Sequence, residues 1–118
     1  MDDLDQLVAE WLTLPDIAER LGLRVTLVRR LVQERQLVAV RRGERNVLSV
    51  PALLLGPDGL LPELPGTLSV LADSGLEGEA ALRWLFTLDP TIAGGSPIGA
   101  LQAGHKTEVR RRAQALAF

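Results

Sequence analysis

The sequence contains no cysteine and only one histidine, His105, among its 118 residues. Without thiols it has no disulfide, no thiolate nucleophile and no cysteine-ligated zinc. A single histidine argues against a histidine metal centre or a catalytic triad, and no carboxylate pair has a spacing that suits acid–base catalysis. We therefore expect a protein that is not an enzyme and that needs no metal or cofactor.

Long apolar runs and aromatic residues are also scarce. Aromatic residues make up 3% of the chain, and every apolar stretch falls short of the roughly 20 residues of a membrane span. The first residues, MDDLDQLVAE, are acidic, unlike a signal or transit peptide. The 47% hydrophobic residues suffice for a core without a metal or disulfides. These features predict a soluble cytoplasmic protein.

Charge is distributed unevenly along a chain whose formal net charge is −2. Residues 20–45 contain eight arginines and two glutamates, whereas residues 1–19 contain six acids and no base. An acidic protein with one concentrated cationic segment is typical of a local surface that faces nucleic acid.

Two helical patterns precede and enter this cationic segment. Apolar residues at helical spacing predict a first helix over Asp2–Trp11, with Trp11 anchoring it on the second. Thr13 is a predicted N-cap, with Asp16 in a capping-box position, and Gly22 is the predicted left-handed terminator of the second helix.

A third helix is predicted over residues 25–35. At 100° per residue, the inward stripe consists of Val28, Leu31, Val32 and the aliphatic stem of Arg35. The opposite face carries Thr26, Arg30 and Gln33, with Arg29 at its edge. This short, polar and cationic face has the composition of a helix that enters the major groove.

Two β-rich runs follow, at residues 37–40 and 47–50. Gly43 and Asn46 in the four-residue link tolerate positive φ, so we predict a β-hairpin, with its second strand stopped by Pro51. Its tip is expected to carry Arg41, Arg42 and Arg45.

The rest of the chain is predicted to be helical. Residues 56–66 are rich in proline and glycine and form a predicted linker between a domain at 1–55 and one at 67–118. Helices are predicted at 67–74, 77–86, 97–103 and 106–117, with Ser96 as an N-cap and a loop at 87–96. Leu82, Trp84, Leu85 and Phe86 form a predicted packing centre. The predicted fold class is mainly α with a small β-hairpin wing, a winged helix-turn-helix followed by a helical C-terminal subdomain.

Each basic group allows a functional and a purely structural interpretation. Arg29, Arg30 and Gln33 suit base edges, and Arg24 and Thr26 suit phosphates or a thymine methyl group; otherwise they form a solvated helix face. The hairpin arginines Arg41, Arg42 and Arg45 suit the minor groove or flanking phosphates, or else protect an edge strand from aggregation.

The second basic cluster is Arg110-Arg111-Arg112 on the last predicted helix. Its three arginines cannot share one helix face, so a solvated surface with Val109, Ala113 and Leu116 inward is the simpler interpretation. A supplementary phosphate contact is the alternative.

Residues 14–50 resemble excisionase-like and MerR-like winged helix-turn-helix domains, through LPDIAERLGL, VRRLVQERQL and VAVRRG. Nearly the whole chain resembles an actinobacterial family of small winged-helix DNA-binding proteins with a dedicated helical C-terminal domain. The motifs that carry this resemblance are WLTLPDIAERLG, QLVAVRRGE, LPGTLSVL, LRWLFTLDPT and VRRRAQALAF. It implies double-stranded DNA as the partner, and a transcriptional regulator or nucleoid-associated factor.

The sequence departs from these families at two points. Arg24 stands where such domains usually place a serine or threonine before the recognition helix, and no segment supplies the long coiled coil of MerR dimers. A rival resemblance links WLFTLDPTIAGGSPIGAL to the toxin-binding domain of Xre-type antitoxins. It implies a protein-interaction module whose C-terminal helices bind a protein partner or a second copy.

Overall fold

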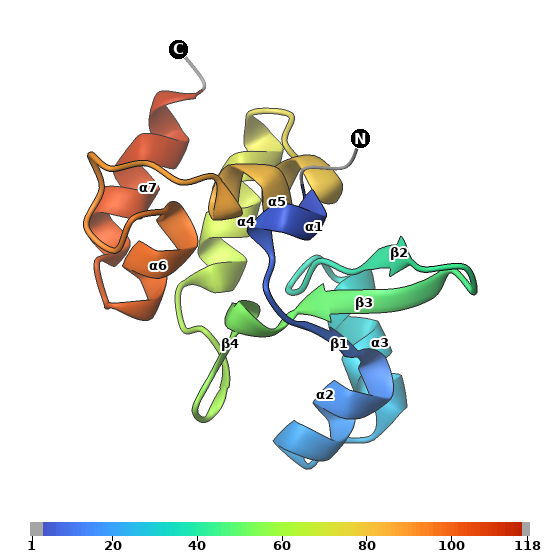
Figure 1. Cartoon of the computed structure of the whole chain (residues 1–118). Coiled ribbons are helices and arrows are strands. Elements are labelled where there is room, and N and C mark those ends of the chain that lie inside the picture. Colours follow the sequence, from blue (N-terminus) through green and yellow to red (C-terminus); the bar gives the residue numbers. More distant parts are fainter. Residues whose placement is uncertain (1–3, 117–118) are drawn as a thin grey trace.

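The computed structural model describes residues 4–116, which form seven α-helices, five strands and one 3-10 helix (Figure 1). The N-terminal half contains α1 (Leu4–Leu7), β1 (Trp11–Thr13), α2 (Leu14–Leu21), α3 (Val25–Gln33), β2 (Val40–Arg42) and β3 (Val47–Pro51). The remainder contains η1 (Ala52–Leu54), β4 (Leu55–Gly56), β5 (Gly59–Leu60), α4 (Leu64–Asp73), α5 (Glu79–Phe86), α6 (Pro97–Gln102) and α7 (Lys106–Ala115).

Helix α2 has the capping residues that the sequence predicts. The Thr13 hydroxyl accepts a hydrogen bond from the Asp16 N–H at 3.2 Å, and the Asp16 carboxylate accepts one from the Thr13 N–H at 3.1 Å. Gly22 ends α2 at φ 68°, a conformation that suits glycine because it has no Cβ. A three-residue turn therefore joins two short helices.

The prediction of one helix from Asp2 to Trp11 is wrong within the described residues; Asp2 itself lies outside them. The helix ends at Leu7, and Trp11 begins β1, which pairs with β3 at Trp11↔Pro51 and Leu12↔Val50. The apolar residues Leu4 and Val8 are buried as expected, but backbone pairing with a distant strand overrides the local periodicity.

The predicted hairpin is present, with its first strand three residues later than expected. β2 pairs with β3 at Arg41↔Leu48, and the sheet order is β1-β3-β2. The turn contains Gly43 at φ 76° and Asn46 at φ 53°. The segment before β2 contributes to the core, because Leu37 is only 1% exposed.

α3 is shorter than the predicted 25–35. It ends at Gln33, and Arg35 adopts φ 63° as the residue that reverses the chain. The Gln36 N–H then bonds to Leu31 O at 2.9 Å, which closes the helix end. Arg35 points outward and pairs with Glu77 at 3.5 Å, so its stem does not extend the inward stripe.

Residues 55–60 form a second, two-stranded hairpin that leads into α4. The four C-terminal helices lie within a few residues of their predicted ranges: α4 begins three residues earlier, at Leu64, α5 begins two residues later, at Glu79, and α6 ends one residue earlier, at Gln102. α7 ends at Ala115, and the predicted end at Ala117 lies outside the described residues. The Ser96 hydroxyl caps α6 by accepting the Gly99 N–H at 3.0 Å. No helix within residues 4–116 is long and apolar enough to cross a membrane.

One continuous core joins the winged part to the C-terminal helices. Leu82 and Leu85 are fully buried and Phe86 is 3% exposed, whereas Trp84 is only half-buried. Val109 and Ala113 of α7 face inward as predicted, but Leu116 is 43% exposed. The Gln102 amide adds a polar tie by donating to Leu53 O at 2.6 Å and to Leu55 O at 3.3 Å.

Candidate nucleic-acid interface

The outward face of α3 is polar, as the sequence predicts. Val28 is fully buried against the rest of the domain. The exposed positions of α3 are Thr26, Leu27, Arg29, Arg30 and Gln33. Leu27 is 41% exposed, and the four polar residues have the spacing of one side of a helix. Arg24 occupies the N-cap without a side-chain cap bond, so its guanidinium is available at the start of the same helix.

Arg41 lies on the side of the wing that faces this helix. It is opposite Leu48 in the β2–β3 register, whereas Arg42 is opposite Val47, so the two arginines project from opposite faces of the sheet. Arg41 and Arg29 line one shallow hollow together with Leu14, Pro15, Asn46, Val47 and Leu48. A bond from the Arg41 guanidinium to Asn46 O, 2.9 Å long, holds the side chain across the turn.

Arg42 turns away from this hollow. Its guanidinium lies over the Trp11 ring, 4.2 Å from the centroid. Its Nε donates to Asp5 Oδ1 at 3.1 Å, and a second nitrogen binds the same oxygen. The structure therefore separates Arg42 from the other predicted site residues.

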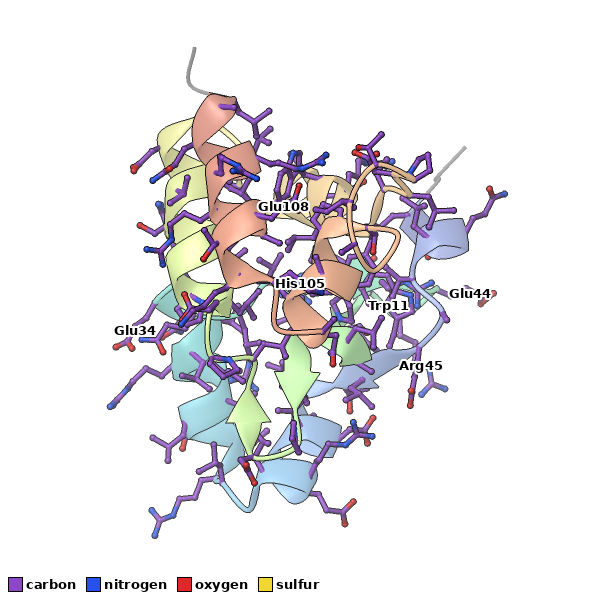
Figure 2. All side chains as sticks on the ribbon, turned by 90° about the vertical axis from the view of Figure 1, so that its left-hand side faces the viewer. Trp11, Glu34, Glu44, Arg45, His105 and Glu108 are labelled. Carbon is purple, nitrogen blue, oxygen red and sulfur yellow. The ribbon has the colours of Figure 1, made fainter. Side chains whose placement is uncertain are left out.

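The predicted position of three arginines at the hairpin tip needs correction. Only Arg45 lies in the turn itself, where it is exposed and points into solvent (Figure 2). Arg41 and Arg42 belong to β2, where strand alternation sends them to different sides.

Five arginines of the winged domain form no ion pair with the acids of the described residues. Within residues 4–116, no acid lies within ion-pair distance of Arg24, Arg29, Arg30, Arg41 or Arg45. Exposed guanidinium groups that are not in ion pairs with the described carboxylates are suited to phosphates.

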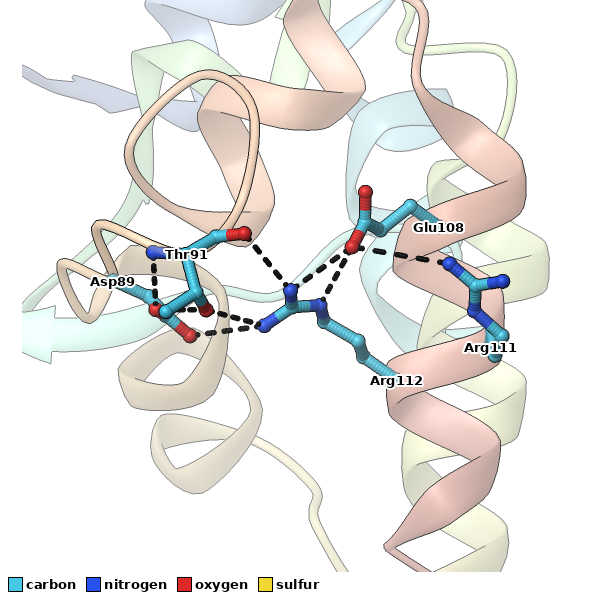
Figure 3. Close-up of polar contacts among 5 residues, drawn as sticks. All are labelled: Asp89, Thr91, Glu108, Arg111 and Arg112. Carbon is cyan, nitrogen blue, oxygen red and sulfur yellow. Dashed lines mark hydrogen bonds and ion pairs between the residues drawn. The ribbon is translucent and has the colours of Figure 1, made fainter.

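The cations of α7, in contrast, form ion pairs with carboxylates. Arg110 and Lys106 pair with Glu63 at 3.1 and 3.6 Å. Arg112 reaches Asp89 and Glu108, and Arg111 approaches Glu108 at 3.9 Å (Figure 3). These side chains tie α7 to α4 and to the loop at 87–96.

Two carboxyl groups have shifted pKa values, and both shifts come from structural hydrogen bonds. The backbone and hydroxyl of Thr13 lower the pKa of Asp16, with a smaller contribution from Arg20. The hydroxyl and N–H of Thr91 lower the pKa of Asp89, again with a smaller contribution from an arginine, Arg112. Both groups stay ionised at neutral pH.

Sequence reasoning missed the two partners of Arg42, namely Asp5 and Trp11. The available signal was the alternation of adjacent arginines along a strand, together with an acid-rich N-terminal segment. Among the described residues, no group of three or more His, Cys, Asp and Glu side chains is arranged to hold a metal ion.

Comparisons with known proteins agree with this architecture. Residues 1–55 match the family model described as "DNA-binding protein Rv2175c, wHTH domain", and residues 61–117 match "Rv2175c C-terminal domain of unknown function". The DNA-binding protein Rv2175c of Mycobacterium tuberculosis is 38% identical over 117 residues, covering 89% of this chain and 79% of that protein.

The solved NMR structure of Rv2175c aligns with a TM-score of 0.81 at 35% identity. The alignment covers 92% of this chain and 82% of that one. With both family models matched in order and a relative aligned over most of its length, the chain belongs to the Rv2175c family, which combines a winged helix-turn-helix domain with a helical C-terminal domain.

Proposed function

We propose that this protein binds double-stranded DNA, with α3 in the major groove and the β2–β3 wing on the adjacent backbone. In this proposal it acts without catalysis, as a transcriptional regulator or nucleoid-associated factor in the cytoplasm. The observation that carries the proposal is that Arg29 of α3 and Arg41 of β2 line one hollow. The name of the relative, a DNA-binding protein, supports the same partner.

The roles of the side chains follow from their chemistry. Arg29, Arg30 and Gln33 lie on the exposed face of α3 and are suited to guanine and adenine edges. Arg24 is at the helix N-terminus, where backbone N–H groups also favour a phosphate. Arg41 is suited to a backbone phosphate beside the groove, as winged domains of the excisionase and MerR type would place it.

The C-terminal helices have no role in DNA contact in this proposal. Their arginines are already paired with Glu63, Glu108 and Asp89, so a phosphate would have to displace a carboxylate. Their supported role is to buttress the winged domain through the shared core.

Salt dependence of DNA affinity tests the proposal. If between four and six arginines each neutralise one phosphate, log K should fall with log salt at a slope of about −3.6 to −5.4. Fluorescence anisotropy of a labelled duplex at several salt concentrations measures this slope. Arg30→Ala should cost about 1–3 kcal/mol on a preferred sequence, whereas Arg110→Ala, which removes a paired C-terminal arginine, should change little. A flat salt dependence would contradict the proposal.

A further inference from the structure

We propose that Arg42 is a positioning residue: it clasps α1 to the wing and thereby raises DNA affinity without touching DNA. The inference rests on the proposed function, because its readout is DNA binding. It concerns the Arg42 clasp, which we define as Asp5 of α1, Trp11 of β1 and Arg42 of β2.

The clasp joins three segments that are separate in sequence. β1 and β2 both pair with β3 and do not pair with each other. The register places Trp11 opposite Pro51 and Arg42 opposite Val47, so both side chains lie on the same face of β3. The Arg42 side chain therefore crosses the sheet to reach the Trp11 ring, while its nitrogens bind Asp5.

Arg42 is already engaged in contacts within the protein. One face of its guanidinium covers an aromatic ring, and two of its nitrogens share one carboxylate oxygen. The side chain is 31% exposed, less than half the value of the exposed Arg35 at 72%. A phosphate contact by Arg42 would have to displace Asp5 or use the remaining N–H groups on the α1 side of the sheet, away from the hollow that contains Arg29 and Arg41.

The Arg42 clasp also orients a short edge strand, β2. β2 is three residues long and is an edge strand of the three-stranded sheet, paired only with β3. β1 pairs with residues 49–51 of β3, so at residues 47 and 48 the sheet narrows to the β2–β3 ribbon, and a two-stranded ribbon has little stability of its own. Holding Arg42 on the α1 side commits Arg41, the preceding residue in the strand, to the opposite side. That is the side on which Arg41 lies beside Arg29.

The direction in which Asp5→Asn changes DNA affinity tests the proposal. It weakens the clasp and leaves every arginine in place. If the clasp positions the wing, DNA affinity falls by up to about fivefold, the range expected for losing one partly exposed ion pair. If Asp5 instead competes with DNA for Arg42, affinity rises and the salt slope steepens. An increase or an unchanged affinity overturns the proposal.

Glu10→Gln is the matched control, because it removes one exposed N-terminal acid that has no ion pair within residues 4–116. Any general effect of lowering the negative charge appears equally in this variant. Thermal unfolding of both variants identifies a global loss of folding, and amide chemical shifts of β2 report whether the wing has moved.

A second pair of variants separates positioning from contact. Arg41→Ala should reduce the magnitude of the salt slope by about 0.9, the value of one phosphate. Arg42→Met should lower affinity through Arg41, so in the Arg41→Ala background it should not reduce the slope further; a further reduction of about 0.9 in that background would show a phosphate contact by Arg42 and overturn the proposal. If wild-type binding is itself insensitive to salt, the proposed function fails, and that result is distinct from either outcome for Arg42.

Discussion

Replacing Arg112 with methionine should destabilise the protein by about 2 kcal/mol. The guanidinium donates to Asp89 and to the Thr91 hydroxyl at 3.1 Å each, to Thr91 O at 3.1 Å and to Glu108 at 3.0 Å (Figure 3). Buried hydrogen bonds to charged groups contribute roughly 1.5–3 kcal/mol each. Because Arg112 is 32% exposed, solvent screening reduces the sum to about 2 kcal/mol. Methionine keeps the aliphatic packing and removes only the polar contacts.

The assay is thermal unfolding followed by circular dichroism at neutral pH. For a domain of this size, about 2 kcal/mol corresponds to a fall in Tm of roughly 6–12 °C. Arg111→Met is the control: Arg111 is 74% exposed and has one contact at 3.9 Å, so its loss should stay within about 0.5 kcal/mol. Equal Tm values for the two variants would refute the view that Arg112 fixes the loop at 87–96.

Three further predictions concern capping, close packing and pH. Thr13→Ala removes the acceptor of the Asp16 N–H and should cost about 1 kcal/mol in urea denaturation; an unchanged midpoint would contradict this. Gly94→Ala should lower Tm more than Gly95→Ala, because its Cβ would lie 2.5 Å from the Gly99 carbonyl carbon, whereas at Gly95 the space is open. The folded-state pKa values of Asp16 and Asp89 are lowered from 3.8. Their stabilisation is therefore present above pH 3.8 and lost as pH falls through the folded values. Replacing both with asparagine should reduce the fall of Tm with decreasing pH. An unchanged fall of Tm would exclude these groups as its cause.

The helices were predictable because their determinants are local. Thr13, Gly22 and Ser96 act within one turn of their own helix, so their effects can be inferred from neighbouring residues. β1 was not predictable in this way. Trp11 and Leu12 pair with residues about forty positions away, and a helical spacing of apolar residues over so short a segment does not exclude a single turn followed by a strand.

The same distinction between local and long-range determinants applies to the candidate interface. The outward face of α3 follows from helical periodicity alone, and the structure confirms that Arg30 and Gln33 are exposed. Which of the two faces Arg41 takes, and which Arg42, depends on the register with β3, and the hairpin sequence does not determine that register. The partner Asp5 depends in turn on where α1 packs, and only the tertiary structure shows that.

The most direct test of the central claim is to map amide chemical-shift changes on the full chain as duplex DNA is added at low salt. The claim is that the uncompensated arginines of α3 and β2 form the DNA-facing surface. We expect the largest changes at the α2–α3 turn, along α3 and around Arg41, with little change in α4 to α7. Changes concentrated in α7 or in the loop at 87–96, with α3 unaffected, would contradict the account.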